Sequence, residues 1–128
     1  MAKITLTPPF TGAELAAAFN NNSDELYVGI GVKTPTVVDT DTYTVLSADN
    51  VIHVTRTAVG TCTITVPSAL ITAGVDVLVK DAGGNAGVNN ITIITEGVET
   101  IDNSENLIIN KNYNAAHVYS DGTNLFIY

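Results

Sequence analysis

Residue types that catalyse reactions or bind metals are few in this chain, and they are widely spaced. The two histidines, His53 and His117, each lie inside an apolar stretch with the alternation of a β-strand. Neither has an acidic neighbour beside it in sequence, so we expect packed or surface residues; a metal pair across strands is the alternative. The single cysteine, Cys62, alternates with Ile64 and Val66 on the apolar face of a predicted strand. It is therefore expected to be a small core residue and not a nucleophile.

Three polar loops contain the remaining candidates for ligand binding. The glycine-rich stretch 81–87 lacks the Lys-Ser/Thr ending of a phosphate-binding loop and precedes a strand, so it predicts a flexible turn. Residues 39–41 and 96–102 are acidic and could supply oxygen ligands to calcium, but neither has the EF-hand pattern. Solvated loop acids are the simpler interpretation. We therefore expect no catalytic residue, no cofactor and no metal, and we expect that the protein is not an enzyme.

The composition excludes some partners. The chain has 128 residues, of which 45% are hydrophobic and 14% charged, and its net charge is −8. Its five basic residues are scattered, so neither nucleic acid nor an anionic membrane is an expected partner. One cysteine and the lack of a long apolar segment predict folding in a reducing cytoplasm, without a signal peptide or membrane span. So few charges also suggest that partners or other copies of the chain cover part of the surface.

Residues 1–35 predict an N-terminal arm with one short helix. Thr11 and Glu14 have the spacing of a capping box, and Phe10 precedes them as a hydrophobic staple would. The helix is either packed on its own domain or used in self-association, because its apolar seam has heptad spacing with one polar member. We therefore name five candidate partner-binding residues: Phe10, Leu15, Phe19, Asn22 and Leu26.

Residues 36–128 predict a β module, because threonine, valine and isoleucine dominate and turn residues recur. An Asp-Gly-Thr-Asn sequence at 121–124 predicts a hairpin turn with positive φ at Gly122. The expected fold is mostly β, a compact sandwich, barrel or prism-like module with one short N-terminal helix. About eight short strands are expected, at 43–46, 51–55, 61–66, 75–80, 91–95, 107–109, 115–120 and 125–128.

Three sequence stretches within residues 42–128 carry a family resemblance. They are Lys-Asp-x-x-Gly-Asn at 80–85, Asn-Asn-Ile-Thr-Ile at 89–93 and Tyr-Ser-Asp-Gly-Thr-Asn at 119–124. Together they resemble a β module of tailed-bacteriophage virion proteins, found in tail fibres, head fibres and capsid decoration (cement) proteins. The usual tryptophan-rich pair after Thr-Asn is replaced here by Leu125-Phe126. The arm resembles attachment or trimerisation segments of such proteins more loosely.

The resemblance implies a homotrimer located in the virion. A chain of 128 residues that begins with methionine suits a decoration protein, which would bind the major capsid protein on the capsid surface and stabilise the shell. The alternative is a tail-fibre or head-fibre module that recognises the host cell surface. For a glycan ligand we would expect exposed aromatic residues near polar ones, and the candidates are Tyr113 and Tyr119.

Overall fold

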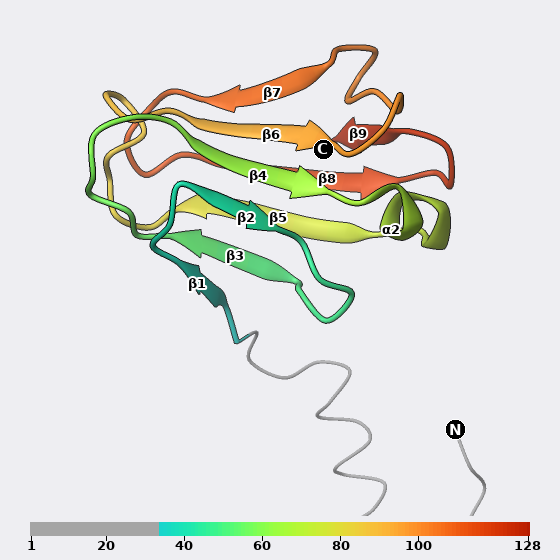
Figure 1. Cartoon of the computed structure of the whole chain (residues 1–128), viewed down its shortest axis with the longest axis horizontal. Helices are drawn as coiled ribbons and strands as arrows, with labels where there is room; N and C mark the ends of the chain where they lie inside the picture. The colour runs from blue at the N-terminus through green and yellow to red at the C-terminus, as the bar shows by residue number, and fades with distance from the viewer. Residues whose placement is uncertain (1–33) are drawn as a thin grey trace, which may run out of the picture. The chain divides into compact units, whose positions relative to one another are not determined.

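The β-branched segments of the module form nine strands in two sheets, and one short helix follows the fourth strand along the chain (Figure 1). The computed structural model describes residues 34–128, so the predicted N-terminal helix and Phe10, Leu15, Phe19, Asn22 and Leu26 lie outside the described residues. The elements are β1 Thr36–Val38, β2 Thr42–Thr44, β3 Val51–Val54, β4 Cys62–Val66, α2 Ser68–Ala73, β5 Asp76–Asp81, β6 Ile91–Thr95, β7 Asn106–Ile109, β8 Ala115–Ser120 and β9 Leu125–Ile127.

The chain alternates between the two sheets for its first six strands. One sheet has the order β1-β3-β5-β8-β9 and the other β2-β4-β6-β7. Because each return brings the chain back to the same sheet in the same direction, β1-β3-β5 and β2-β4-β6 are parallel. The last three strands then pair antiparallel, β7 with β6, β8 with β5, and β9 with β8. The chain thus winds between the two sheets through its parallel strands, and antiparallel strands complete both sheets.

Alternate residues of both sheets form one core between them. Ile52 pairs with Val79 in one sheet and Ile64 with Ile93 in the other, and all four side chains are fully buried. The predicted alternation of Cys62, Ile64 and Val66 toward the core is confirmed. The outward positions of these strands remain partly exposed, including a row of threonines in which Thr42, Thr63 and Thr92 are register partners. Period-2 patterning therefore fixes which face of each strand is buried.

The buried carboxylate of Asp49 connects β1, β2 and the β2–β3 loop through hydrogen bonds. Asp49 accepts hydrogen bonds from the Thr36 hydroxyl (2.6 Å), the Tyr43 hydroxyl (2.8 Å) and the backbone N–H of Leu46 (2.8 Å). Burial and the neighbouring Asp49 carboxylate raise the pKa of Tyr43 to about 12. Burial would raise the pKa of Asp49, but the donors outweigh it and lower that pKa. The ionised form of Asp49 therefore stabilises the folded state.

The structure confirms a mostly β fold, with its strands in two sheets, and corrects several details. Residues 34–128 contain nine strands and not eight, because Thr36–Val38 pairs with β3 and is an additional edge strand. The helix α2 was not predicted, although Pro67 before it and Gly74 after it, with φ of 88°, are ordinary helix-boundary residues. The parallel pairing was also unexpected. Hydrophobic alternation is the same for parallel and antiparallel strands, so it does not report direction.

Strand direction sorts the loops to two ends of the module. The β1–β2, β3–β4, β5–β6 and β7–β8 loops share one end, which we call the loop end. The β2–β3, β4–β5, β6–β7 and β8–β9 connections share the other, where α2 also lies (Figure 1). Among the described residues, no helix is long and apolar enough to cross a membrane.

Candidate interaction surfaces

A buried arginine fixes the β3–β4 loop. Arg56 is 6% exposed, and its guanidinium contacts Asp41 with 2.7 Å between the nearest charged atoms. It also donates hydrogen bonds to the backbone carbonyls of Val59 (3.1 Å) and Gly60. A buried guanidinium needs such partners, and in meeting that need it holds the loop backbone in place. Asp41 of the predicted acidic loop is thus an ion-pair partner of Arg56, although its side chain remains 78% exposed.

A buried carboxylate fixes the β5–β6 loop in the same way. Asp81 Oδ1 accepts the backbone N–H groups of Gly84 (3.0 Å) and Asn85 (3.2 Å). Its Oδ2 accepts those of Ala86 (2.9 Å) and Tyr113 (3.0 Å). Burial would raise the pKa of Asp81, but these four donors outweigh it and lower the pKa. The Lys-Asp-x-x-Gly-Asn sequence is therefore a structural loop, and its turn is held at several points.

Two asparagines connect the tips of neighbouring loops. The Asn89 side-chain oxygen accepts the Gly60 N–H (3.0 Å), which joins the β5–β6 and β3–β4 loops. The Asn112 side-chain oxygen accepts the Gly87 N–H (2.7 Å), which joins the β7–β8 and β5–β6 loops. Three loops from different strands thus form one hydrogen-bonded assembly. Such a network restrains their backbones before any partner arrives.

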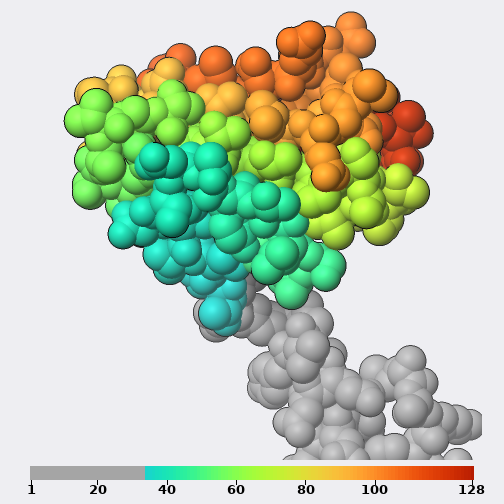
Figure 2. All heavy atoms as spheres, in the orientation of Figure 1, coloured from blue at the N-terminus to red at the C-terminus, as the bar shows by residue number. Residues whose placement is uncertain are grey.

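Large apolar side chains project from these restrained loops. Val59 is 91% exposed, Val88 is 86% exposed and Tyr113 is 65% exposed. Each lies beside one of the residues that the asparagines connect. Tyr113 also has a φ of 61°, which L-residues rarely adopt. We call Val59, Val88 and Tyr113 the loop-tip surface; Figure 2 shows one face of the module, on which the β3–β4 loop is drawn in green.

Charge is distributed unequally between the two ends. All three basic residues of the described segment, Arg56, Lys80 and Lys111, lie at or beside the loop end. Seven of its carboxylates lie at the opposite end, which we call the acidic end: Asp49, Asp76, Glu96, Glu99, Asp102, Glu105 and Asp121. The loop end is therefore close to neutral, whereas the acidic end attracts cations and repels anions.

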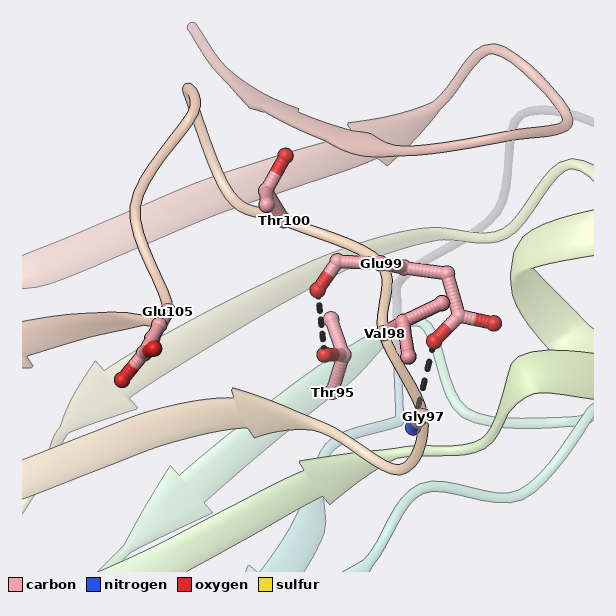
Figure 3. Close-up of a pocket in the computed structure, with 6 residues that line it drawn as sticks. All are labelled: Thr95, Gly97, Val98, Glu99, Thr100 and Glu105. Carbon is pink, nitrogen blue, oxygen red and sulfur yellow. Dashed lines mark hydrogen bonds between the residues drawn. The ribbon is translucent and has the colours of Figure 1, made fainter.

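The second acidic loop folds back on itself. Glu96 accepts the N–H of Ser68 (3.1 Å), and the Glu99 carboxylate accepts the N–H of Gly97 (3.1 Å). Figure 3 shows the hollow at this loop, in which Thr95 also donates to the Glu99 carbonyl (2.6 Å). Hydrogen bonding from the nearby Ser68 hydroxyl is the main cause that lowers the pKa of Glu99. Within residues 34–128, no three His, Cys, Asp or Glu side chains converge as metal ligands would.

An aromatic cluster lies on the outer face of the five-stranded sheet, toward the acidic end. Tyr128 stacks on His117 with ring centroids 4.2 Å apart, and it meets Tyr119 edge to face at 5.0 Å and 79°. The ring centroids of Phe126 and Tyr119 are 5.7 Å apart. The Asp76 carboxylate accepts a hydrogen bond from the Tyr128 hydroxyl (3.2 Å) and contacts His117 Nε2. We call Asp76, His117, Tyr119, Phe126 and Tyr128 the aromatic cluster.

The cluster surrounds an open depression lined by Asp76, Tyr119 and Tyr128. Tyr128 is 64% exposed and Tyr119 is 39% exposed. Burial by neighbours and the Asp76 carboxylate raise the pKa of Tyr128, so its hydroxyl remains a donor to that carboxylate at neutral pH. The depression therefore combines aromatic surface with one negative group.

The residues singled out from sequence have different positions. His53 and His117 lie on strands separated by β5 and in different rows, with Lys80 and Leu78 as their register partners, so they are not neighbours. Cys62 is buried, and its burial raises the pKa of its thiol. Tyr119 belongs to the aromatic cluster, whereas Tyr113 belongs to the loop-tip surface, where Lys80 lies 5.8 Å from its ring centroid.

Sequence reasoning missed Asp76 and Tyr128 because their partners are distant along the chain. Asp76 begins β5 and His117 lies in β8, and the register pairs Asp76 with Tyr119. Both residues are visible in the sequence, Asp76 at the start of a strand and Tyr128 as the last residue given, but the sequence does not show that their side chains meet.

No model of a known protein family matches this chain, and no curated protein matches it either.

Proposed function

We propose that the protein is a structural component of a tailed-phage virion, most simply a decoration protein that binds the major capsid protein as a homotrimer. It acts by binding and not by catalysis. The sequence resemblance supports the virion role. The observation that carries the proposal is the loop-tip surface, in which Val59, Val88 and Tyr113 are exposed on loops that buried charges hold in place.

The energetics fit a docking surface. Burial of a valine or a larger apolar side chain stabilises a complex by about 1.5–3 kcal/mol. Loops that are already restrained lose little conformational entropy on binding, so more of this gain appears as affinity. A trimer that engages three capsid sites at once multiplies modest contacts through avidity. The nearly neutral loop end also approaches an acidic partner with less repulsion than the acidic end would.

Charge substitutions on the loop-tip surface test the proposal. Val59→Asp and Val88→Asp should each lower occupancy on capsids that lack the protein, because a carboxylate must be desolvated in the interface. Val98→Asp is the matched control, since Val98 is a loop valine, 97% exposed, at the acidic end. Equal occupancy of all three variants would contradict a docking role for the loop tips.

Two further experiments address the virion role itself. Light scattering should give about three times the 13.4 kDa chain mass, and a monomer at micromolar concentration would remove the trimer from the proposal. Labelled protein should be distributed over the capsid shell of assembled phage. Deletion of residues 1–33 tests whether the arm contributes attachment: occupancy should fall while the β module remains folded.

A second candidate function is recognition of the host surface by a tail or head fibre. The aromatic cluster favours it, because Tyr119 and Tyr128 expose ring surface beside a carboxylate. Label found at the tail tip and not on the shell would select this function.

A further inference from the structure

We infer that the aromatic cluster is a binding site for an organic cation, an ammonium or guanidinium group carried by a partner molecule. The inference does not depend on capsid binding, and it concerns a different face of the module from the loop-tip surface.

The geometry of the rings provides the first argument. Tyr119 and Tyr128 meet at 79°, so their rings form two walls of an open corner. A cation placed over a tyrosine ring within about 6 Å of its centroid is attracted by the π-electrons. The same contact occurs elsewhere in this chain, where Lys80 Nζ lies 5.8 Å from the Tyr113 centroid. In the cluster, the corner has no lysine or arginine among its lining residues.

The carboxylate provides the second argument. Asp76 lines the same depression, and its side chain is 59% exposed. The Tyr128 hydroxyl donates to one of its oxygens and His117 contacts the other, which holds the carboxylate against the ring walls. Each carboxylate oxygen accepts more than one hydrogen bond, so an ammonium or guanidinium N–H can still bind there. Phenol and carboxylate together thus offer a cation both of its preferred contacts.

The charge around the cluster decides between ligand classes. Asp76 belongs to the acidic end, where seven carboxylates of the described segment lie without a lysine or arginine. This field attracts a cation and repels phosphate or sialic acid groups. A neutral sugar could stack on the same rings, but it would gain nothing from the surrounding charge. An organic cation uses the rings, Asp76 and the field together.

Titration of the full-length protein with choline chloride tests the inference. Amide and aromatic NMR shifts are measured at pH 8, above the range in which histidines ordinarily titrate, with sodium chloride at matched ionic strength as the control. We expect saturable shifts at Tyr119, Phe126 and Tyr128, with a dissociation constant in the millimolar range, which corresponds to roughly −4 kcal/mol. Affinity should fall as salt is raised, because the charges are exposed.

Three variants assign the contacts. Asp76→Asn keeps the shape and removes the charge, and it should weaken choline binding about 2- to 5-fold, as loss of one exposed ion pair implies. Tyr128→Ala should abolish measurable binding, whereas Tyr128→Phe keeps the ring and should bind within about threefold of the wild type. Tyr113→Ala changes an exposed tyrosine at the loop end and should leave binding unchanged.

Parallel titrations distinguish the source of the cation. Tighter binding of choline indicates a small quaternary headgroup, and tighter binding of N-acetylarginine amide indicates a basic side chain of a protein; either supports the inference. Two results would overturn it. One is the absence of saturable shifts with either cation in the wild-type protein. The other is that methyl glucoside binds the wild-type protein as tightly as the cations do, with an affinity that Asp76→Asn does not lower. Neither result bears on capsid occupancy, so failure of this site and failure of the capsid proposal are separable.

Discussion

Replacement of Asp81 by asparagine is the sharpest test of how the loop end is held. The carboxylate is 2% exposed and accepts four backbone N–H groups, two on each oxygen. The asparagine side chain is nearly isosteric with aspartate, but it keeps only one oxygen as an acceptor. Its amide NH₂ would then face two backbone N–H donors, so two hydrogen bonds would be lost and the donors would oppose one another.

The expected cost follows from these lost bonds. An unsatisfied buried donor costs about 1–3 kcal/mol, and partial relaxation of the loop reduces the total, so Asp81→Asn should lower the free energy of unfolding by about 2–4 kcal/mol. That is a large share of the roughly 5–15 kcal/mol typical of a folded domain. Because Asp81 also holds the Tyr113 N–H, the NMR signals of the β7–β8 loop should shift with those of 84–86.

Urea denaturation followed by circular dichroism at pH 7 measures this cost. Asp39→Asn makes the same chemical change at an exposed loop position and should stay within about 0.5 kcal/mol of the wild type. The reasoning is refuted if Asp81→Asn also unfolds within about 0.5 kcal/mol of the wild type, since the four hydrogen bonds would then contribute nothing net.

Three other outcomes are expected. The pKa values of Asp49 and Asp81 are lowered in the folded protein, so the stability that their charges contribute is complete above about pH 4 and is lost as pH falls through the pKa values of the folded state. Urea titrations at pH 7 and pH 3 should show this loss of stability, and the loss should be smaller in Asp81→Asn. Gly84→Ala should cost about 1–2 kcal/mol in the same assay, because φ is 70° there and the new Cβ would lie 2.3 Å from the Tyr113 ring. Cys62 should react with a thiol reagent only on unfolding, because it is 1% exposed and its thiol pKa is raised; fast labelling of native protein would contradict this.

Much of the fold could be predicted because local signals are strong. The alternation of Cys62, Ile64 and Val66 identifies a strand and its buried face. The turn at 121–124 is confirmed as well, since Gly122 has a φ of 97° and Asp121 accepts the N–H groups of Thr123 and Asn124 at 2.9 Å. β1 was missed because a three-residue strand at a sheet edge has too few residues to show a period.

The candidate surfaces could be predicted only in part. Tyr113 and Tyr119 were chosen as exposed aromatics, and both are exposed, but they belong to different surfaces at different ends of the module. The acidic residues of 39–41 and 96–102 were interpreted as solvated loop acids, with calcium ligands as the alternative. In the structure, Asp41 pairs with Arg56, and Glu96 and Glu99 accept backbone N–H groups. A carboxylate in sequence does not show which donor it meets.

The sequence by itself determined the composition of the module, the buried face of its main strands and its acidic charge, because these depend on residue type and on neighbours one or two positions away. Only the tertiary structure decided strand direction, and with it everything that depends on which loops share an end. Parallel return of the chain brings Val59 and Val88 to one end, and the antiparallel pairing of β7 and β8 brings Tyr113 to the same end. Register across β5, β8 and β9 brings Asp76 to His117 and Tyr128. These contacts span tens of residues, and no local pattern encodes them.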